Sequence, residues 1–172
     1  MAAYPLHLVR RRRLADGREV TIRPVRAGDE RGEARFLEQL SGESQRLRFL
    51  SFVQAPGETL VHFFTHIDYD RHMAFVCEAE GGELTGEARY VANADGRSCE
   101  FGVVVADDWR HSGVARLLMD ALIRAAQARK LETMAGLVLS ENRDMLNFAR
   151  ALGFELNPDA DKPALVRVTR KL

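Results

Sequence analysis

The sequence has little that would bind a nucleic acid or cross a membrane. Twenty-five Lys and Arg residues balance twenty-five Asp and Glu residues, so the 172-residue chain carries no formal net charge. No overall field therefore draws it to a polyanion. No apolar run approaches the ~20 residues that a membrane-spanning helix needs. We expect neither a nucleic-acid partner nor a membrane partner.

Cysteine is scarce, and the first residues do not resemble a secretory leader. Cys77 and Cys99 are too few for the disulfide scaffold of a small secreted protein. The basic run Arg10 to Arg13 follows the apolar stretch Tyr4 to Val9, whereas positive charge precedes the apolar segment in a leader. We expect a cytoplasmic protein with buried cysteines and with residues 1–17 as a solvated N-terminal arm.

The length and the 46% of hydrophobic residues predict a single domain, residues 1–172, with a sizeable core. Apolar periodicity predicts strands at 18–25, 72–79, 84–92, 99–105 and 134–139, a closing hairpin of 154–156 with 165–168, and helices at 28–40, 43–52, 58–67, 114–125 and 141–152. Ser140 is a suitable cap for the last helix. This order predicts an α+β fold in which helices flank both faces of a mixed, mostly antiparallel sheet.

The segment from Val103 to Ala115 passes from a predicted strand through a short loop into a predicted helix. The first N–H groups of a helix lack partners, and the helix dipole places partial positive charge there, so phosphate fits. Gly113 lets a ligand approach the backbone, while Arg110 and Arg116 add charge that suits a pyrophosphate. A plain helix start is the alternative, and the spacing alone leaves both open.

Two familiar nucleotide-binding motifs are excluded at this loop. A Walker loop needs Gly-Lys-Ser/Thr, and the loop contains no Lys. A dinucleotide fingerprint needs three glycines after the first strand of a parallel unit, whereas a single Gly follows an antiparallel meander here. The sequence therefore predicts neither an NTPase loop nor a dinucleotide fold.

The sequence Arg110-His111-Ser112-Gly113-Val114-Ala115 matches the R/Q-x-x-G-x-G/A signature of the GNAT N-acetyltransferases, and residues 142–154 are similar to a later helix of that family. Residues 21–25, 48–49 and 67–70 resemble, more specifically, the acetyltransferase module of bacterial protein lysine acetyltransferases of the Pat type. The resemblance covers nearly the whole chain. It implies the GNAT fold, acetyl-CoA as co-substrate, and direct acetyl transfer to a primary amine, a protein lysine in the Pat type.

The resemblance also implies roles for individual positions. The backbone of the strand before the signature binds the pantetheine arm in GNAT enzymes, and the amides of the signature bind the pyrophosphate. The positions that match are Val103, Val104, Val105, Arg110, His111, Ser112, Gly113, Val114, Ala115, Arg116 and Asn142. Asn142, near a predicted helix start, is equally a helix cap.

Glu100 is the candidate catalytic residue, because it matches the glutamate that serves as base in Pat-like enzymes. A lysine amine with a pKa of about 10.4 is neutral only about once in ~2,500 at pH 7, so a nearby base is useful. Strand alternation places Phe101, Val103 and Val105 on one face and Glu100 on the other. A solvated strand glutamate is the alternative interpretation.

The sequence departs from many GNAT enzymes at one position. A Tyr seven residues after the Asn donates a proton to the departing thiolate in those enzymes, but here Ala149 stands there. Either the thiolate leaves without that donor, or the domain is a catalytically silent acetyl-CoA sensor. A small-molecule amine acetyltransferase is the nearest alternative. The acceptor, the acyl-chain preference and a homodimeric state stay open.

A metal site is considered and not predicted. His62 and His66 lie four apart on one predicted helical face, but Phe63 stands where a zincin has its Glu. Asp107 and Asp108 could attract a cationic substrate, although carboxylates are ordinary in loops. We therefore expect no metal.

Overall fold

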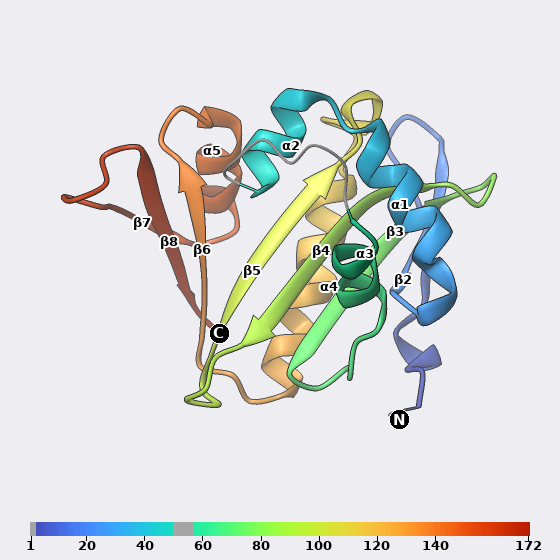
Figure 1. Ribbon diagram of the computed structural model, residues 1–172, viewed down its shortest axis with the longest axis horizontal. Coiled ribbons are helices and arrows are strands. Elements are labelled where there is room, and N and C mark those ends of the chain that lie inside the picture. The colour runs from blue at the N-terminus through green and yellow to red at the C-terminus, as the bar shows by residue number, and fades with distance from the viewer. Residues whose placement is uncertain (1–2, 50–56) are drawn as a thin grey trace.

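A mixed sheet forms the centre of the molecule (Figure 1). The computed structural model describes residues 3–49 and 57–172. In this part of the chain eight strands lie in the order β1-β2-β3-β4-β5-β6-β8-β7, and only β5 and β6 are parallel neighbours. The strands are β1 (Arg10–Arg13), β2 (Glu19–Pro24), β3 (His72–Ala79), β4 (Leu84–Ala92), β5 (Ser98–Val105), β6 (Thr133–Leu139), β7 (Glu155–Pro158) and β8 (Leu165–Lys171).

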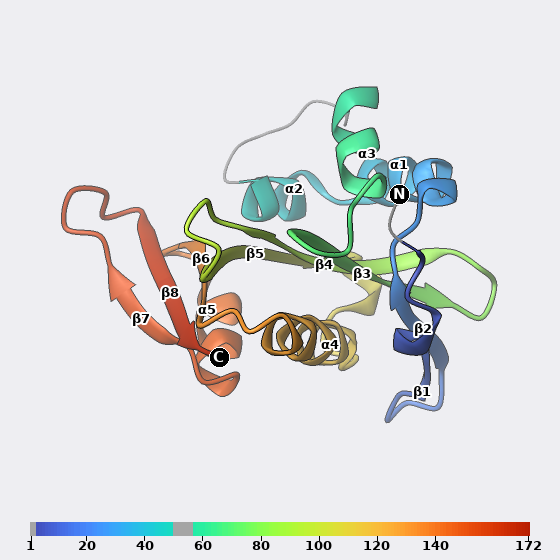
Figure 2. The same ribbon diagram turned by 90° about the horizontal axis from the view of Figure 1, so that it is seen from below.

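Helices cover both faces of this sheet, and Figure 2 shows α1, α2 and α3 on one side with α4 and α5 on the other. The helices are α1 (Glu30–Gln39), α2 (Gly42–Phe49), α3 (Glu58–Thr65), α4 (Val114–Ala128) and α5 (Arg143–Ala151), with single 3-10 turns at Leu6–Leu8, Ala27–Asp29 and Asp107–Trp109. This arrangement confirms the predicted α+β class. None of the helices described is long and apolar enough to cross a membrane.

The apolar stripe of α4 makes the larger of two buried clusters. Val114, Leu118 and Leu122 are fully buried and pack in one cluster with Phe75 and Tyr90 of the sheet. A smaller cluster lies under α1 and α3 on the opposite face. The helical spacing read from the sequence is therefore the spacing of side chains that face the sheet.

Three local predictions need correction or addition. The basic run expected to be a solvated arm forms the edge strand β1, because pairing with β2 satisfies its backbone while its four guanidinium groups stay exposed. The helix expected from 141 begins at Arg143, and Asn142 rather than Ser140 caps it. The predicted helix over 43–52 extends past α2 into residues outside the described part.

Candidate active site

The parallel strands β5 and β6 pair over only three residues and then diverge (Figure 1). Their ladder ends at the pair Glu100 and Ala135. Beyond it, Phe101 to Val105 keep antiparallel partners on β4, but β6 no longer pairs with their other edge. The backbone N–H and C=O groups along that edge therefore face an opening and need another partner.

The ring of Phe101 fills the space between the two strands just past the end of the ladder. A Cβ built on Gly136 of β6 would lie 2.7 Å from Phe101 Cε1, so only glycine leaves room for the ring. The same ring packs against Phe154, with 5.0 Å between centroids. Phe101 and Gly136 together hold the strands apart at this point.

A cavity of about 1120 Å³ occupies the opening between β5 and β6. Residues of α2 form one wall, and the start of α5 forms another. All six residues from Glu100 to Val105 line it, together with residues from the loop before α4. The cavity therefore joins an unpaired strand edge to the N-terminal end of a helix.

That helix end has the features of an anion-binding site. Gly113, the N-cap of α4, has a φ of 95°, and no side chain caps the helix from this position. His111 is also left-handed, with a φ of 58°. Backbone of this kind turns successive N–H groups toward one side, and the helix dipole favours negative charge there. Glycine is needed at 113 for its φ, since a Cβ there would meet nothing within 4 Å.

The side chains of the loop bind mainly to the protein itself. Arg110 donates to the hydroxyl of Ser44 on α2, and Arg116 pairs with Asp120 at 3.2 Å. Ser112 donates to the carbonyl of Trp109 and is the one predicted cofactor-binding residue that does not line the cavity. Two amides of the loop have only long hydrogen bonds of 3.4 Å, Arg110 to the carbonyl of Asp107 and Val114 to the hydroxyl of Ser112. A ligand would therefore meet backbone amides more than these side chains.

Asp107 ties this loop to α2, a contact that the sequence did not predict. Its carboxylate accepts from the backbone N–H of Ser41 at 3.0 Å and from the hydroxyl of Ser44 at 2.6 Å. Burial alone would raise the pKa of Asp107, but the hydrogen bonds from Ser44 and Ser41 outweigh it and lower the pKa. The hydroxyl oxygen of Ser41 accepts from the backbone N–H of Ser44 at 3.1 Å and so caps α2. Asp107 thus holds this cap from 66 residues away.

Glu100 stands at the closed end of the opening, on the sheet face that carries α2. Its side chain keeps 39% of its surface exposed and accepts a hydrogen bond from Arg167 of β8 on Oε1. The partner could not be read from the sequence, because β8 reaches this place only through its pairing with β6. The ion pair fixes the carboxylate at the cavity wall.

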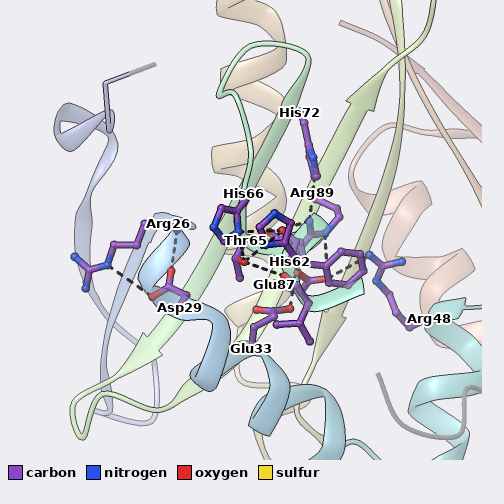
Figure 3. Close-up of polar contacts among 12 residues, drawn as sticks. Arg26, Asp29, Glu33, Arg48, His62, Thr65, His66, His72, Glu87 and Arg89 are labelled. Atoms are coloured by element: carbon purple, nitrogen blue, oxygen red, sulfur yellow. Dashed lines mark hydrogen bonds and ion pairs between the residues drawn. The ribbon is translucent and has the colours of Figure 1, made fainter. Parts of the chain in front are cut away.

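A buried charged cluster lies behind that wall, beneath α1 and α3 (Figure 3). Glu87 of β4 forms an ion pair with Arg89 and a second one with Arg48 of α2, at 3.2 Å. Arg48 also lines the cavity, and its guanidinium lies so close to Gly102 that a Cβ there would be 2.8 Å from Cζ. The cluster therefore supports the cavity wall through Arg48.

The two carboxyl groups of this cluster have opposite protonation behaviour. Burial and the charge of Glu87 raise the pKa of Glu33 well above its usual value. Burial also acts to raise the pKa of Glu87, but the charges of Arg89 and Arg48 outweigh it and lower that pKa to about 2. Glu33 thus keeps its proton more readily than an ordinary glutamate, whereas Glu87 is ionised at neutral pH.

The comparisons with known proteins agree with this geometry. The model of the acetyltransferase (GNAT) family matches residues 38–154. The chain belongs to the GNAT family. The acetyltransferase PA5475 of Pseudomonas aeruginosa is 36% identical over 151 residues, which are 86% of this chain and 81% of that protein. The chain is therefore an acetyltransferase, as its signature predicted.

Solved structures agree as well. The GNAT domain of S. lividans PAT superposes with a TM-score of 0.91 at 27% identity, over 99% of this chain and 100% of that one. A phosphinothricin acetyltransferase from Sinorhizobium meliloti, solved in complex with AcCoA, shares the fold with a TM-score of 0.73 at 20% identity, over 89% and 88% of the two chains. The GNAT family uses acetyl-CoA, so acetyl-CoA is the co-substrate expected for this chain.

The structure also places the later positions of the GNAT resemblance. Asn142 accepts from the backbone N–H of Met145 at 3.1 Å and so caps α5, while it also lines the cavity. Ala149 is buried in the main core. Tyr69 donates to the carbonyl of Val25, and Tyr90 is fully buried on β4. Neither tyrosine lines the cavity.

Proposed function

We propose that this acetyltransferase moves the acetyl group of acetyl-CoA directly to a primary amine, the side chain of a protein lysine, with Glu100 as general base. The observation that carries the proposal is one continuous cavity that joins the free edge of β5 and the α4 N-terminus to Glu100. The resemblance to Pat-type enzymes and the match to the S. lividans GNAT domain support a lysine as acceptor.

The cavity suits acetyl-CoA along its whole length. The free strand edge at Val103 to Val105 offers backbone donors and acceptors to the amide groups of a pantetheine arm. The amides around Gly113 suit the pyrophosphate. A backbone N–H on this edge of β5 would also polarise the thioester carbonyl, the site where negative charge develops.

In this proposal Glu100 removes the proton of the attacking amine. Keeping a lysine neutral at pH 7 costs roughly 4.6 kcal/mol, from the difference between its pKa and the pH. Arg167 binds Oε1 of Glu100, which leaves Oε2 to accept a proton from the amine or from a water next to it. As the nitrogen bonds to the acetyl carbon and the C–S bond breaks, the proton passes to this carboxylate and the thiolate leaves.

The thiolate leaves without a tyrosine donor in this proposal. Ala149 replaces that tyrosine and is buried, and neither Tyr69 nor Tyr90 lines the cavity. A thiol is more acidic than an alcohol, so the thiolate of coenzyme A leaves more easily than an alkoxide would. A catalytically silent sensor would share the cavity but would transfer no acetyl group.

The first experiment measures acetyl-CoA binding by calorimetry, with Gly113→Glu as the control that repels the pyrophosphate and strains the left-handed residue. Micromolar binding that the variant loses is expected. Acetyl transfer is then measured on lysine peptides and on free small amines. Turnover of peptides supports a lysine acceptor. Turnover of small amines alone replaces the lysine with a small-molecule acceptor. Turnover of neither leaves the catalytically silent sensor as the interpretation.

Glu100→Gln tests the base separately. The variant should lower kcat by about 10²-fold or more, the usual contribution of a general base, and should leave the affinity for acetyl-CoA unchanged. Arg167→Gln is the matched variant, because it removes the partner of Glu100 and keeps the carboxylate. Unchanged turnover in Glu100→Gln would remove Glu100 from the mechanism.

A further inference from the structure

Three exposed side chains from two helices meet outside the cavity. Glu30 is the first residue of α1, and His62 and His66 lie one turn apart on α3. Figure 3 shows the two imidazoles beside each other on that helix, with 3.7 Å between ring centroids. None of the three lines the cavity, so the acetyltransferase reaction gives them no role.

Their spacing is that of ligands around a single metal ion. Nδ1 of His62 lies 3.3 Å from Oε1 of Glu30, and Nδ1 of His66 lies 3.5 Å from the same oxygen. A tetrahedral ion with bonds of about 2.0–2.1 Å holds its ligand atoms about 3.3–3.4 Å apart. All three candidate ligand atoms lie within 4.8 Å of one another. The two distances from Glu30 therefore lie close to the edge length of the tetrahedron.

The chemistry of the three groups points to one class of ion. Two neutral imidazoles and one carboxylate are the donors preferred by zinc and its neighbours among the divalent transition metals, whereas magnesium and calcium prefer oxygen donors. The exposure of all three groups leaves a fourth position for water. In the described part of the chain no other group of three such side chains comes this close.

The carboxylate of this group does not lie between the two histidines in the sequence. A zincin carries its Glu between the two histidines, where this chain has Phe63. Here the carboxylate comes from Glu30, 32 residues before His62, and α1 brings it to α3. The site is therefore formed only by the folded arrangement of two helices.

The groups around the site are compatible with an empty and with a loaded state. Nδ1 of His66 also lies 3.2 Å from the carbonyl oxygen of His62 and 3.1 Å from the Thr65 hydroxyl, so it has partners when no ion is bound. The Thr65 hydroxyl can donate to the carbonyl of Val61 at 2.9 Å instead. Nδ1 of His66 can thus turn to an ion without leaving the Thr65 hydroxyl unpaired.

We propose that Glu30, His62 and His66 bind one divalent transition-metal ion of the zinc class and that the ion joins α1 to α3. The buried Glu33 belongs to α1, and the buried Glu87 of β4 lies beneath these helices (Figure 3). An ion that bridges them stabilises this cover in the folded state only, because the ligands come together only there. The site is independent of the acetyl-transfer proposal.

Binding of Zn²⁺ chloride by metal-free full-length protein at pH 7.5 tests the site by calorimetry, with Co²⁺ absorption as a second readout of tetrahedral geometry. One ion per chain with a micromolar Kd and a raised Tm is expected. His62→Ala, His66→Ala and Glu30→Gln should each weaken binding at least tenfold. His7→Ala removes another exposed histidine and should change nothing.

Two outcomes would overturn the site. Wild-type protein that binds no Zn²⁺ below about 1 mM has no such site. Binding that persists in both His62→Ala and His66→Ala takes place elsewhere on the protein. Circular dichroism and acetyl-CoA affinity, measured on every variant, show that a loss of metal binding is not a loss of folding.

Discussion

Glu33 and Glu87 show how two identical functional groups take different states in one buried cluster. Burial and the charge of Glu87 disfavour the charged form of Glu33, so Glu33→Gln, which places a neutral amide of the same shape there, should lower stability by less than about 1 kcal/mol. Glu87→Gln leaves the charges of Arg89 and Arg48 without their shared carboxylate, which should cost about 3–5 kcal/mol. Urea unfolding at pH 7 measures both. Equal losses of stability in the two variants would contradict the opposite pKa shifts of Glu33 and Glu87.

His72 should make stability depend on pH in the mildly acidic range. Burial first and the charge of Arg89 second lower the pKa of His72 to about 4 from an ordinary 6.5, and Arg89 donates to its Nε2 at 3.0 Å. Between pH 6.5 and 4, His72 therefore binds a proton in the unfolded chain but not in the folded chain. The free energy of unfolding falls as the pH drops through this range. Urea midpoints across this range should be flatter in His72→Gln, and an unchanged slope would refute the role of His72.

Candidate site residues could be named from the sequence where the signal is local. The residue types of Gly113 and Asn142 indicate a helix start. Glu100 was named only through a family resemblance. Asp107 and Arg167 were missed as partners, because the first contacts residues 63–66 positions away and the second 67 positions away. A spacing rule covers one helix or strand, and these contacts exist only after the sheet has assembled.

At the scale of elements, the separation of β5 and β6 is the feature on which the cavity depends. Gly136→Ala places a methyl group 2.7 Å from the ring of Phe101, so the ring must move into the opening. Stability should fall by about 1–3 kcal/mol, the usual cost of overpacking, and acetyl-CoA affinity should fall about tenfold. Gly81→Ala is the control, since its Cβ meets nothing within 4 Å. Unchanged acetyl-CoA affinity in Gly136→Ala would show that the ring of Phe101 does not set the width of the opening between β5 and β6.

The elements themselves were largely predictable from periodicity, as the described helices and the central meander show. The strand β1 was not, since four consecutive arginines carry no alternation and form a strand only because the edge of β2 is available. The point where β5 leaves β6 was not readable from periodicity either. It depends on Phe101 meeting Gly136, and those two residues belong to different strands.

At the scale of the whole molecule, one ion pair joins the helices of one sheet face to the segment before α5. Arg46 of α2 pairs with Glu141, and Glu141 lines the cavity. The pair is well exposed on the Glu141 side, with 60% of that side chain accessible. Its contribution to stability should therefore be small, while its position lets it restrain movement of α2 relative to α5.

Glu141→Gln should leave the free energy of unfolding within about 0.5 kcal/mol of wild type, because exposed ion pairs contribute little. Acetyl-CoA should dissociate faster, by about fivefold at most, the equivalent of ~1 kcal/mol. High salt should reduce the difference, since it screens the wild-type pair. Stopped-flow displacement measures the rate of acetyl-CoA dissociation. Glu132→Gln is the control, because it breaks an exposed ion pair with Arg97, and neither Glu132 nor Arg97 lines the cavity. An equal change in both variants would show a general effect of charge, whereas a change confined to Glu141→Gln places the restraint at the cavity between α2 and α5.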